Sequence, residues 1–242
     1  MFKTVMKTAA HLYESIGGLY LTPVLLMERK LQRSARVNER PVEYAFVFDC
    51  LARICPAEVL DVGSGRAGLP HLMATCGLRV TAVDKMDGYW KGQFVNRHYY
   101  VAKDDITQSK IKKQFDLVTC ISVLEHIPDH EAAFRGMFQL LKPGGHLLIT
   151  CPYNESRYVE NVYALPGAGY GQNAAYVCQV YSRNEINAWL KQNPGEIVRQ
   201  EYYQIFAGDL WTFGGRIHPF KKVAQDEKHH LTCILIRKAE QP

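Results

Sequence analysis

The chain has 242 residues and a formal net charge of +5, and its composition is that of an ordinary soluble globular protein. This length accommodates one α/β domain with additions. No apolar run approaches the ~20 residues of a membrane span, and no secretory leader is recognisable. The seven cysteines are scattered without CxxC or metal-finger spacing, so we expect a reducing compartment and predict a cytoplasmic protein.

The positive charge is concentrated early in the chain. Residues 1–40 contain seven basic and three acidic residues, a net charge of +4. Such an excess suits an anionic partner, for example a weakly contacted membrane surface, and is also typical of a solvated helix face. Apolar spacing within 5–35 and again within 41–54 predicts helices.

The stretch 58–73 predicts a strand, a glycine-rich turn and a helix in immediate succession. Gly63 and Gly65 give the backbone freedom where a ligand approaches it closely, and the following helix directs unpaired N–H groups at that ligand. The glycine spacing alone also fits a dinucleotide-binding turn. Asp61 separates the two alternatives, because a carboxylate there would repel a pyrophosphate but suits a cationic or hydroxyl-bearing ligand.

Two further strands are predicted, each followed by an acidic residue. Asp84 ends the strand at 78–84, about 20 residues past the glycines. A carboxylate at this place can accept hydrogen bonds from ribose hydroxyls, whether the ligand is a dinucleotide or a nucleoside without a pyrophosphate. A third strand at 99–101 is followed by two acids, Asp104 and Asp105, and an acid at this place can accept a hydrogen bond from a ligand.

A second motif follows between 115 and 151. The apolar run 115–122 predicts a buried strand, and Glu125 and His126 follow it in a short loop. A helix is expected from about 129, capped by Asp129, and the sequence Lys-Pro-Gly-Gly at 142–145 ends it before a strand at 146–151.

The order and spacing of these two motifs resemble the core of class I S-adenosylmethionine (SAM) methyltransferases over residues 57–152. Within that class they are most similar to quinone-type and natural-product O-methyltransferases. The resemblance implies an α/β fold with a Rossmann-like doubly wound sheet of about seven strands, the last one antiparallel. It also implies a helical cap or lid at 1–40 and a SAM-binding domain at 41–242. The runs 196–206 and 231–237 would pair as an antiparallel hairpin at the sheet edge.

The resemblance also implies roles for individual residues. The methionine end of SAM would lie at Asp61, Gly63, Ser64 and Gly65, and Ile121 would line the pocket from the fourth strand. Asp84 and Lys85 would hold the ribose, Met86 would lie against the adenine with Trp90 as a second candidate, and Asp105 with Ile106 would bind the adenine edge. His126 is the candidate base, because an imidazole suits deprotonation of a hydroxyl near neutral pH. The alternative is that Glu125 and His126 only order their loop or shape the pocket.

Metal dependence is not predicted. Some relatives carry an acidic residue three positions before the glutamate of the Glu-His pair and bind a divalent ion there, but this chain has Ser122 at that position.

Residues 153–181 contain six tyrosines and three glycines in a segment without a strand or helix pattern. A loop this long in a compact domain is usually functional, so we interpret it as a substrate-binding insertion with aromatic walls, and Tyr153 at its start as a second catalytic candidate. The alternative is a surface subdomain whose tyrosines pack on one another. A second insertion is expected near 207–230.

The predicted function is SAM-dependent methyl transfer, with S-adenosylhomocysteine as product, to a hydroxyl of a small or lipid-linked molecule. Three alternatives remain open: a nicotinamide-dependent oxidoreductase, a non-catalytic SAM-fold binding protein, and, less favoured, a nucleic-acid methyltransferase.

Overall fold

The computed structural model describes residues 12–13, 15–19, 21–27, 30, 37–87, 96 and 98–240. The chain divides into two compact units, residues 1–38 and 39–242. The described part of the first unit is helical, and most of the predicted cap lies outside the described residues. None of the helices described is both long and apolar enough to cross a bilayer.

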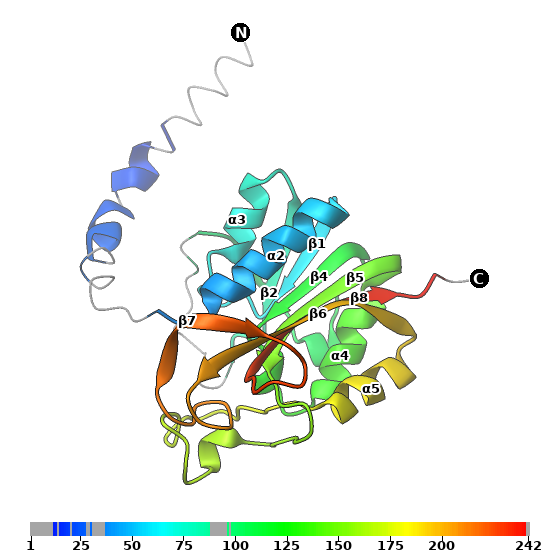
Figure 1. Ribbon diagram of the computed structural model, residues 1–242. Coiled ribbons are helices and arrows are strands. Elements are labelled where there is room, and N and C mark those ends of the chain that lie inside the picture. Colours follow the sequence, from blue (N-terminus) through cyan, green and yellow to red (C-terminus); the bar gives the residue numbers. More distant parts are fainter. Residues whose placement is uncertain are drawn as a thin grey trace. The chain divides into compact units, whose positions relative to one another are not determined.

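In the second unit, the described residues form one eight-stranded sheet with the order β3-β2-β1-β4-β5-β8-β6-β7 (Figure 1). Strands β1 (Glu58–Val62), β2 (Arg79–Asp84), β3 (Val101–Lys103), β4 (Phe115–Ile121) and β5 (Leu141–Pro152) are mutually parallel. Strand β8 (Leu231–Lys238) runs antiparallel to both β5 and β6 (Gly195–Phe206), and β7 (Arg216–Val223) runs antiparallel to β6 at the edge. The carboxyl ends of β1, β2, β4 and β5 therefore meet at one edge.

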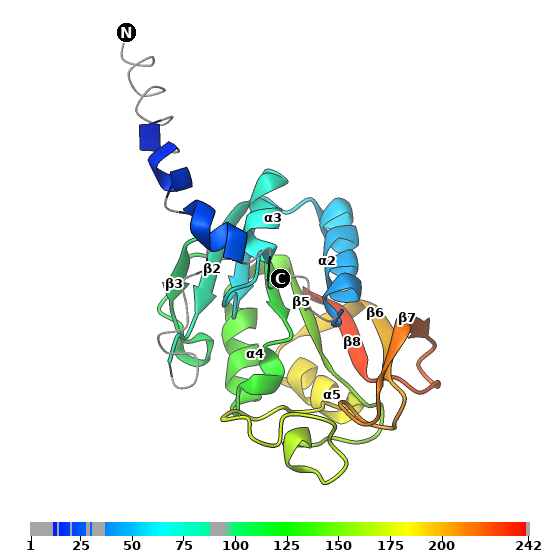
Figure 2. The ribbon, with the colours of Figure 1, turned by 90° about the vertical axis from the view of Figure 1, so that its left-hand side faces the viewer.

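Helices cover both faces of this sheet (Figures 1 and 2). Helices α2 (Arg40–Ile54) and α3 (Leu69–Thr75) pack on one face, and α4 (His130–Gln139) and α5 (Arg183–Gln192) pack on the other. Alternation along β4 supplies both cores, because Leu117 and Ile121 join the α2 side while Val118 and Cys120 join the α4 side. The predicted doubly wound α/β fold is thereby confirmed.

Local sequence explains where the helices on the α4 side begin. The side chain of Asp129 accepts a hydrogen bond from Ala132 N as the N-cap of α4. Helix α5 begins with a capping box in which Ser182 and Glu185 satisfy each other's backbone N–H groups. Both caps lie next to turns that carry site residues, so they fix the ends of those turns.

The sheet differs from the predicted one at its antiparallel side. It has eight strands rather than about seven, because part of the stretch expected as an insertion at 207–230 forms β7. The last strand in sequence, β8, does not end the sheet but lies between β5 and β6. Six of its eight residues are buried, and five of those six are apolar, as expected of a strand covered on both faces.

The segment 153–181 contains no strand of its own but is not an open loop. Isolated bridges join Tyr153 to Tyr181 and Val159 to Val180, and a short 3-10 helix, η4, spans Val162–Ala164. Figure 2 shows the segment in yellow-green, running below α4 and α5. It therefore forms a folded layer next to the carboxyl end of β5.

Candidate active site

The glycine-rich turn after β1 is fixed by backbone geometry. Gly63 has φ +72° and Gly65 has φ +47°, in the left-handed region that favours glycine. A Cβ on Gly63 would lie 2.3 Å from a methyl carbon of Val123. The N–H groups of Gly63 and Ser64 both donate to the carbonyl of Val83, at 2.8 and 3.2 Å. The turn is therefore closed by the end of β2 and packed against the loop that follows β4.

The carboxyl group of Asp61 stabilises this turn through hydrogen bonds. Its carboxyl is 3 % exposed, and its two oxygens accept hydrogen bonds from Ser64 Oγ and Thr119 Oγ1, both at 2.6 Å. Burial raises the pKa of Asp61 to about 6, although the two hydroxyl groups act to lower it. Its carboxyl group faces these two hydroxyls, so Asp61 holds the turn to β4.

The carboxylate of Asp84 lies where β2 meets the turn. Its Oδ2 accepts from Gly65 N at 3.0 Å and its Oδ1 from Met86 N at 2.9 Å. A carboxylate has about four acceptor positions, so capacity remains for further donors. Met86 has φ +50°, an unusual conformation for a residue with a side chain. Trp90 lies outside the described residues.

The next turn joins the remaining acid to this group. Asp105 caps the 3-10 helix η2 (Ile106–Gln108) by accepting from the N–H and hydroxyl of Thr107. Its second oxygen lies 3.1 Å from Lys85 Nζ. Burial acts to raise the pKa of Asp105, but the bonds from Thr107 and Lys85 prevail and lower it. Ile106 is buried in the core on the α4 side.

At the end of β4, side chains of α2 reach the backbone. Arg40 Nη1 donates to the carbonyl of Ile121 at 3.0 Å and to Glu43 at 2.9 Å. Glu43 in turn accepts from Ser122 Oγ at 2.5 Å. Among the residues that the structure describes, no three His, Cys, Asp or Glu side chains are grouped so as to hold a metal ion.

Glu125, in the 3-10 helix η3 (Leu124–His126), is a buried acid without a full set of partners. Its side chain is 3 % exposed, and among the described residues its Oε2 has no hydrogen-bond partner. Burial raises the pKa of Glu125 to about 8. An orphaned polar atom of this kind is rare in a protein interior, which makes Glu125 Oε2 a candidate contact for a ligand.

The ring of His126 is held in one tautomer. Its Nδ1 lies 2.8 Å from the carbonyl oxygen of Val177, which can only accept, so Nδ1 carries the hydrogen. The lone pair of the neutral imidazole is then on Nε2, 3.9 Å from Glu125 Oε1. Burial lowers the pKa of His126, which keeps the ring neutral at neutral pH.

Tyr153 does not join these residues. Its side chain is fully buried, and its hydroxyl donates to Glu155 at 2.8 Å. Its ring stacks on His229 at 5.5 Å between centroids. Burial raises the pKa of this phenol well above its ordinary value, which removes it as a base. We therefore correct its assignment: Tyr153 packs the core instead of facing the site.

Other aromatic residues do extend from His126. Tyr176 lies edge-on to the His126 ring at 4.8 Å, and Tyr163 lies 6.1 Å from Tyr176 and 5.9 Å from Tyr170. Arg216 of β7 then contacts the Tyr170 hydroxyl at 3.1 Å. The predicted insertion thus supplies a continuous row of rings from the base candidate to the β6–β7 hairpin.

Sequence reasoning missed several residues of this site. Asn96 donates through Nδ2 to the carbonyls of Gly65 and Ala67, at 3.0 Å each, and no local pattern signals this. Thr119 could have been found, because in a parallel pair it lies opposite Asp61 in register. Arg40 and Glu43 belong to a helix interpreted only as core packing.

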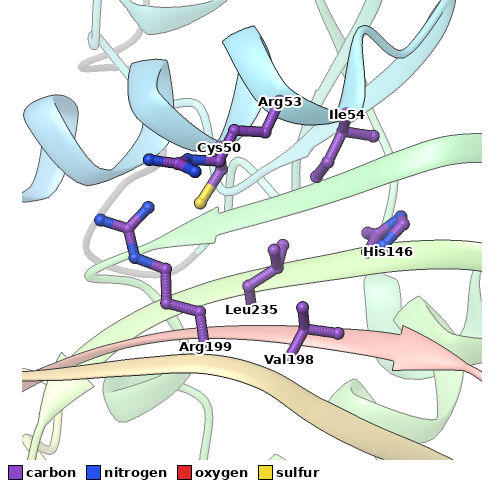
Figure 3. A pocket seen from close by; sticks show the side chains of 7 residues that line it. All are labelled: Cys50, Arg53, Ile54, His146, Val198, Arg199 and Leu235. Carbon is purple, nitrogen blue, oxygen red and sulfur yellow. The ribbon is translucent and has the colours of Figure 1, made fainter.

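A separate pocket of about 480 Å³ lies near the amino ends of the parallel strands (Figure 3). It is lined by Cys50, Arg53, Ile54, His146, Val198, Arg199 and Leu235. None of these is a predicted site residue, and the two arginines already pair with neighbouring carboxylates. This pocket is therefore distinct from the candidate active site.

The family described as "Methyltransferase domain" matches residues 27–199, more than half of the chain. The chain therefore belongs to the methyltransferase domain family, which confirms the relationship predicted from the motifs at 57–152. Among curated proteins, it is similar to the ubiquinone biosynthesis O-methyltransferases of Pseudomonas fluorescens (strain Pf0-1) and Alkalilimnicola ehrlichii. The first is 33 % identical over 121 residues, 47 % of this chain and 51 % of the relative. The second is 32 % identical over 138 residues, 54 % and 55 % of the two chains. The chain thus spans about half the length of the curated relatives it matches.

Solved structures show the same fold. The 1,6-didemethyltoxoflavin-N1-methyltransferase of Burkholderia thailandensis, solved with its substrate and S-adenosylhomocysteine, has a TM-score of 0.55 at 19 % identity, covering 95 % of this chain and 90 % of that one. A SAM-dependent methyltransferase from Clostridium acetobutylicum has a TM-score of 0.53 at 16 % identity, covering 90 % and 98 %.

Proposed function

We propose that this protein is a SAM-dependent methyltransferase that acts on a hydroxyl of a small or lipid-linked molecule. The observation that carries the proposal is the meeting of the glycine turn, Asp84 and His126 at one edge of the sheet. Family membership and the likeness to O-methyltransferases support both the cofactor class and the hydroxyl acceptor.

The residues of this edge fit the cofactor. Gly63 and Gly65 have no side chains that would keep a ligand away from the backbone, and Asp84 retains acceptor capacity for ribose hydroxyls. Met86 and Ile106 would flank the adenine, with Asp105 at its edge. When bound, SAM supplies a methyl group that is already activated by the sulfonium.

The chain's own contribution is to align the acceptor and to take its proton. His126 Nε2 would accept the hydroxyl proton, and the nearby Glu125 carboxyl would face the imidazolium that results. The Val177 carbonyl holds the ring in the tautomer that this step needs. Closely aligned reactants account for much of the rate in such a displacement.

Tyr163, Tyr170 and Tyr176 would form the wall that receives the acceptor. Their rings lie on the His126 side of the site and are joined to the β6–β7 hairpin through Arg216. We interpret segment 153–181 as the part of the chain that selects the substrate.

Calorimetry with SAM, S-adenosylhomocysteine and NAD tests the cofactor, and Asp84→Asn provides the matched variant. We expect binding of the first two, at least about tenfold weaker in the variant, because a hydrogen bond to a charged group contributes about 1.5–3 kcal/mol. Asp104→Asn, in the turn that contains Asp105, is the control. Binding of NAD alone would contradict the proposal.

A screen of hydroxylated acceptors, read by a mass gain of one methyl group, tests the reaction. A chain that binds SAM but methylates no acceptor would favour the non-catalytic alternative. Methylation confined to nitrogen-bearing acceptors would contradict the hydroxyl assignment.

We further propose a cytoplasmic protein whose basic segment 1–40 contacts anionic membrane surfaces weakly. The seven free thiols and the net charge of +4 in that segment support these assignments. Flotation with anionic and with neutral vesicles measures the contact, and equal recovery with both would contradict it.

A further inference from the structure

Glu43 is a buried carboxyl on a helix that contains none of the motifs. It lies in the first turn of α2 and is 0 % exposed. Its Oε1 accepts from Ser122 Oγ at 2.5 Å and from Thr150 Oγ1 at 2.6 Å, and its Oε2 accepts from Arg40 Nη1 at 2.9 Å. One carboxyl thus joins α2 to the carboxyl ends of β4 and β5.

Ser122, which this carboxyl holds, has an unusual backbone. Its φ is +50°, and it has a side chain in a region that favours glycine. Its N–H donates to both the carbonyl and the hydroxyl of Thr150, at 3.0 and 3.1 Å. Such a conformation persists only where the surroundings over-determine it, and it occurs preferentially at functional sites. Here Glu43 and Thr150 provide that constraint.

The position of Ser122 decides where the next residues point. It is the last residue held to the sheet before η3, which contains Glu125 and His126. On the far side, His126 and Glu125 are held by the backbone of the 153–181 segment, through Val177 and Gln179. The short loop between these two supports has little freedom of its own.

We infer that Glu43 is a positioning residue, which fixes Ser122 and thereby sets the placement of Glu125 and His126 for the transfer step. This inference rests on the proposed function. It extends the site to a helix outside residues 57–152.

Burial raises the pKa of Glu43, while Arg40 and the hydrogen bonds from Ser122 and Thr150 act to lower it. In its ionised form, Glu43 has a second effect, exerted through Arg40. Burial lowers the pKa of His126, and the charge of Arg40 lowers it further, while Glu43 pairs with that arginine. The ionisable groups that interact with Glu43 or Glu125 from the surrounding elements are Glu39, Arg40, Tyr44, Cys120, Cys151, Cys178, Tyr181 and Cys233. The thiols and phenols among them are uncharged. Arg40 lowers the pKa of His126, Glu39 and Glu43 interact with Arg40, and Glu125 Oε1 lies 3.9 Å from His126 Nε2.

Glu43→Gln tests both effects. An amide has one oxygen where the carboxylate has two, so either Arg40 or the Ser122–Thr150 pair loses its acceptor. We expect turnover to fall roughly ten- to a hundredfold, as misplacement of reacting groups does. Affinity for S-adenosylhomocysteine should change by less than about twofold, because the glycine turn is untouched. The acid limb of the pH–kcat profile should move to lower pH, since Arg40, which lowers the pKa of His126, has then lost one of the carboxylates that oppose its charge.

Two further variants keep the test decisive. Ser122→Ala removes the positional link but keeps the charge, so turnover should fall while the acid limb stays in place. Glu201→Gln changes a buried, ion-paired glutamate on β6 and should alter neither turnover nor the acid limb of the pH–kcat profile. If Glu43→Gln fails to fold, the Ser122→Ala result alone decides, and wild-type turnover in it overturns the inference.

Nitrogen-15 NMR of the His126 ring, assigned with His126→Gln, separates this inference from the proposed function. The pKa of His126 should be lower in Glu43→Gln than in the wild type whether or not the acceptor is known. An unchanged His126 titration together with unchanged turnover overturns the positioning role. Absence of cofactor binding in the wild type would instead overturn the proposed function.

Discussion

The glycine turn and the η3 loop lie side by side at the edge of the sheet, yet they are held in different ways. The turn is closed by backbone hydrogen bonds to Val83 and by Asp84, all within the span 61–84. The η3 loop is held by side chains and carbonyls far away in sequence, from Glu43 to Val177. Contact between Gly63 and Val123 joins the two.

This difference separates binding from turnover. Under the proposed function, the turn presents its backbone groups to the cofactor, and the η3 loop presents His126 to the acceptor. Changes in one region should therefore leave the property governed by the other largely intact.

The largest effect is expected for Gly63→Ala. The new Cβ would meet Val123 at 2.3 Å, and the residue would remain at φ +72°. Binding of S-adenosylhomocysteine should disappear in calorimetry, and the free energy of unfolding should fall by at least about 2 kcal/mol. Gly215→Ala is the control, since no atom lies within 4 Å of its Cβ position. Normal binding in Gly63→Ala would mean that the turn is not the cofactor site.

The next largest effect is expected for His126→Gln. Turnover should fall by roughly 10²- to 10⁴-fold, the usual contribution of a general base, while affinity for S-adenosylhomocysteine stays unchanged. In the wild type the acid limb should lie below the ordinary pKa of 6.5, because burial favours the neutral ring. His218→Gln, on the edge strand β7, is the control. Full turnover in His126→Gln would assign the histidine to loop structure only.

A smaller effect concerns the pH dependence of stability. The pKa of Glu125 is about 8 in the folded chain and 4.5 ordinarily, so the folded state binds the proton more tightly. Stability contributed by this group is present below pH 4.5 and is lost as the pH rises through 8. Glu125→Gln, which cannot ionise, should therefore gain a few degrees in Tm relative to the wild type between about pH 6 and 9. Glu131→Gln, at an exposed position, should show the same dependence of Tm on pH as the wild type. The same dependence in Glu125→Gln would contradict the raised pKa of Glu125.

The smallest effect is expected for Asn96→Ala. Its amide donates to the carbonyls of Gly65 and Ala67, and its oxygen accepts from His98 and Tyr99. Loss of these bonds should loosen the turn and weaken S-adenosylhomocysteine binding about three- to tenfold. Asn154→Ala removes a comparable set of side-chain bonds in a turn at the start of segment 153–181 and should leave affinity unchanged. An unaltered affinity in Asn96→Ala would mean that the turn keeps its shape without the hydrogen bonds of Asn96.

The sequence predicted well what depends on neighbouring residues. Positive φ at Gly63, the caps at Asp129 and Ser182, and the parallel strands up to β5 each follow from short local patterns. Asp84 was predicted from its place at the end of the second strand and Asp105 from the family resemblance, and their roles in cofactor binding stay predictions. These patterns involve residues that are close in sequence, so the local structure that they predict does not depend on distant contacts.

What the sequence could not predict depends on tertiary contacts. Tyr153 is chemically suited to catalysis, and only its burial against His229 shows that it packs the core. Glu43 reads as part of a helical face, and its link to Ser122 spans 79 positions. Strand β7 was hidden because Arg216–Val223 has exposed polar residues and a proline, as an edge strand does.

The place of β8 has a consequence for how the chain is made. Strand β5 pairs with a strand more than 80 positions later in the sequence, through Leu147, Leu148 and Ile149. Strand β6 pairs with the same strand, β8, on its other side. On the ribosome, the parallel strands β1 to β5 can assemble while β5 still presents an open, apolar edge. Synthesis halted before residue 231 would therefore release a product prone to strand-to-strand aggregation. Molecular chaperones that shield unpaired strands would therefore bind this chain while its last residues are being synthesised.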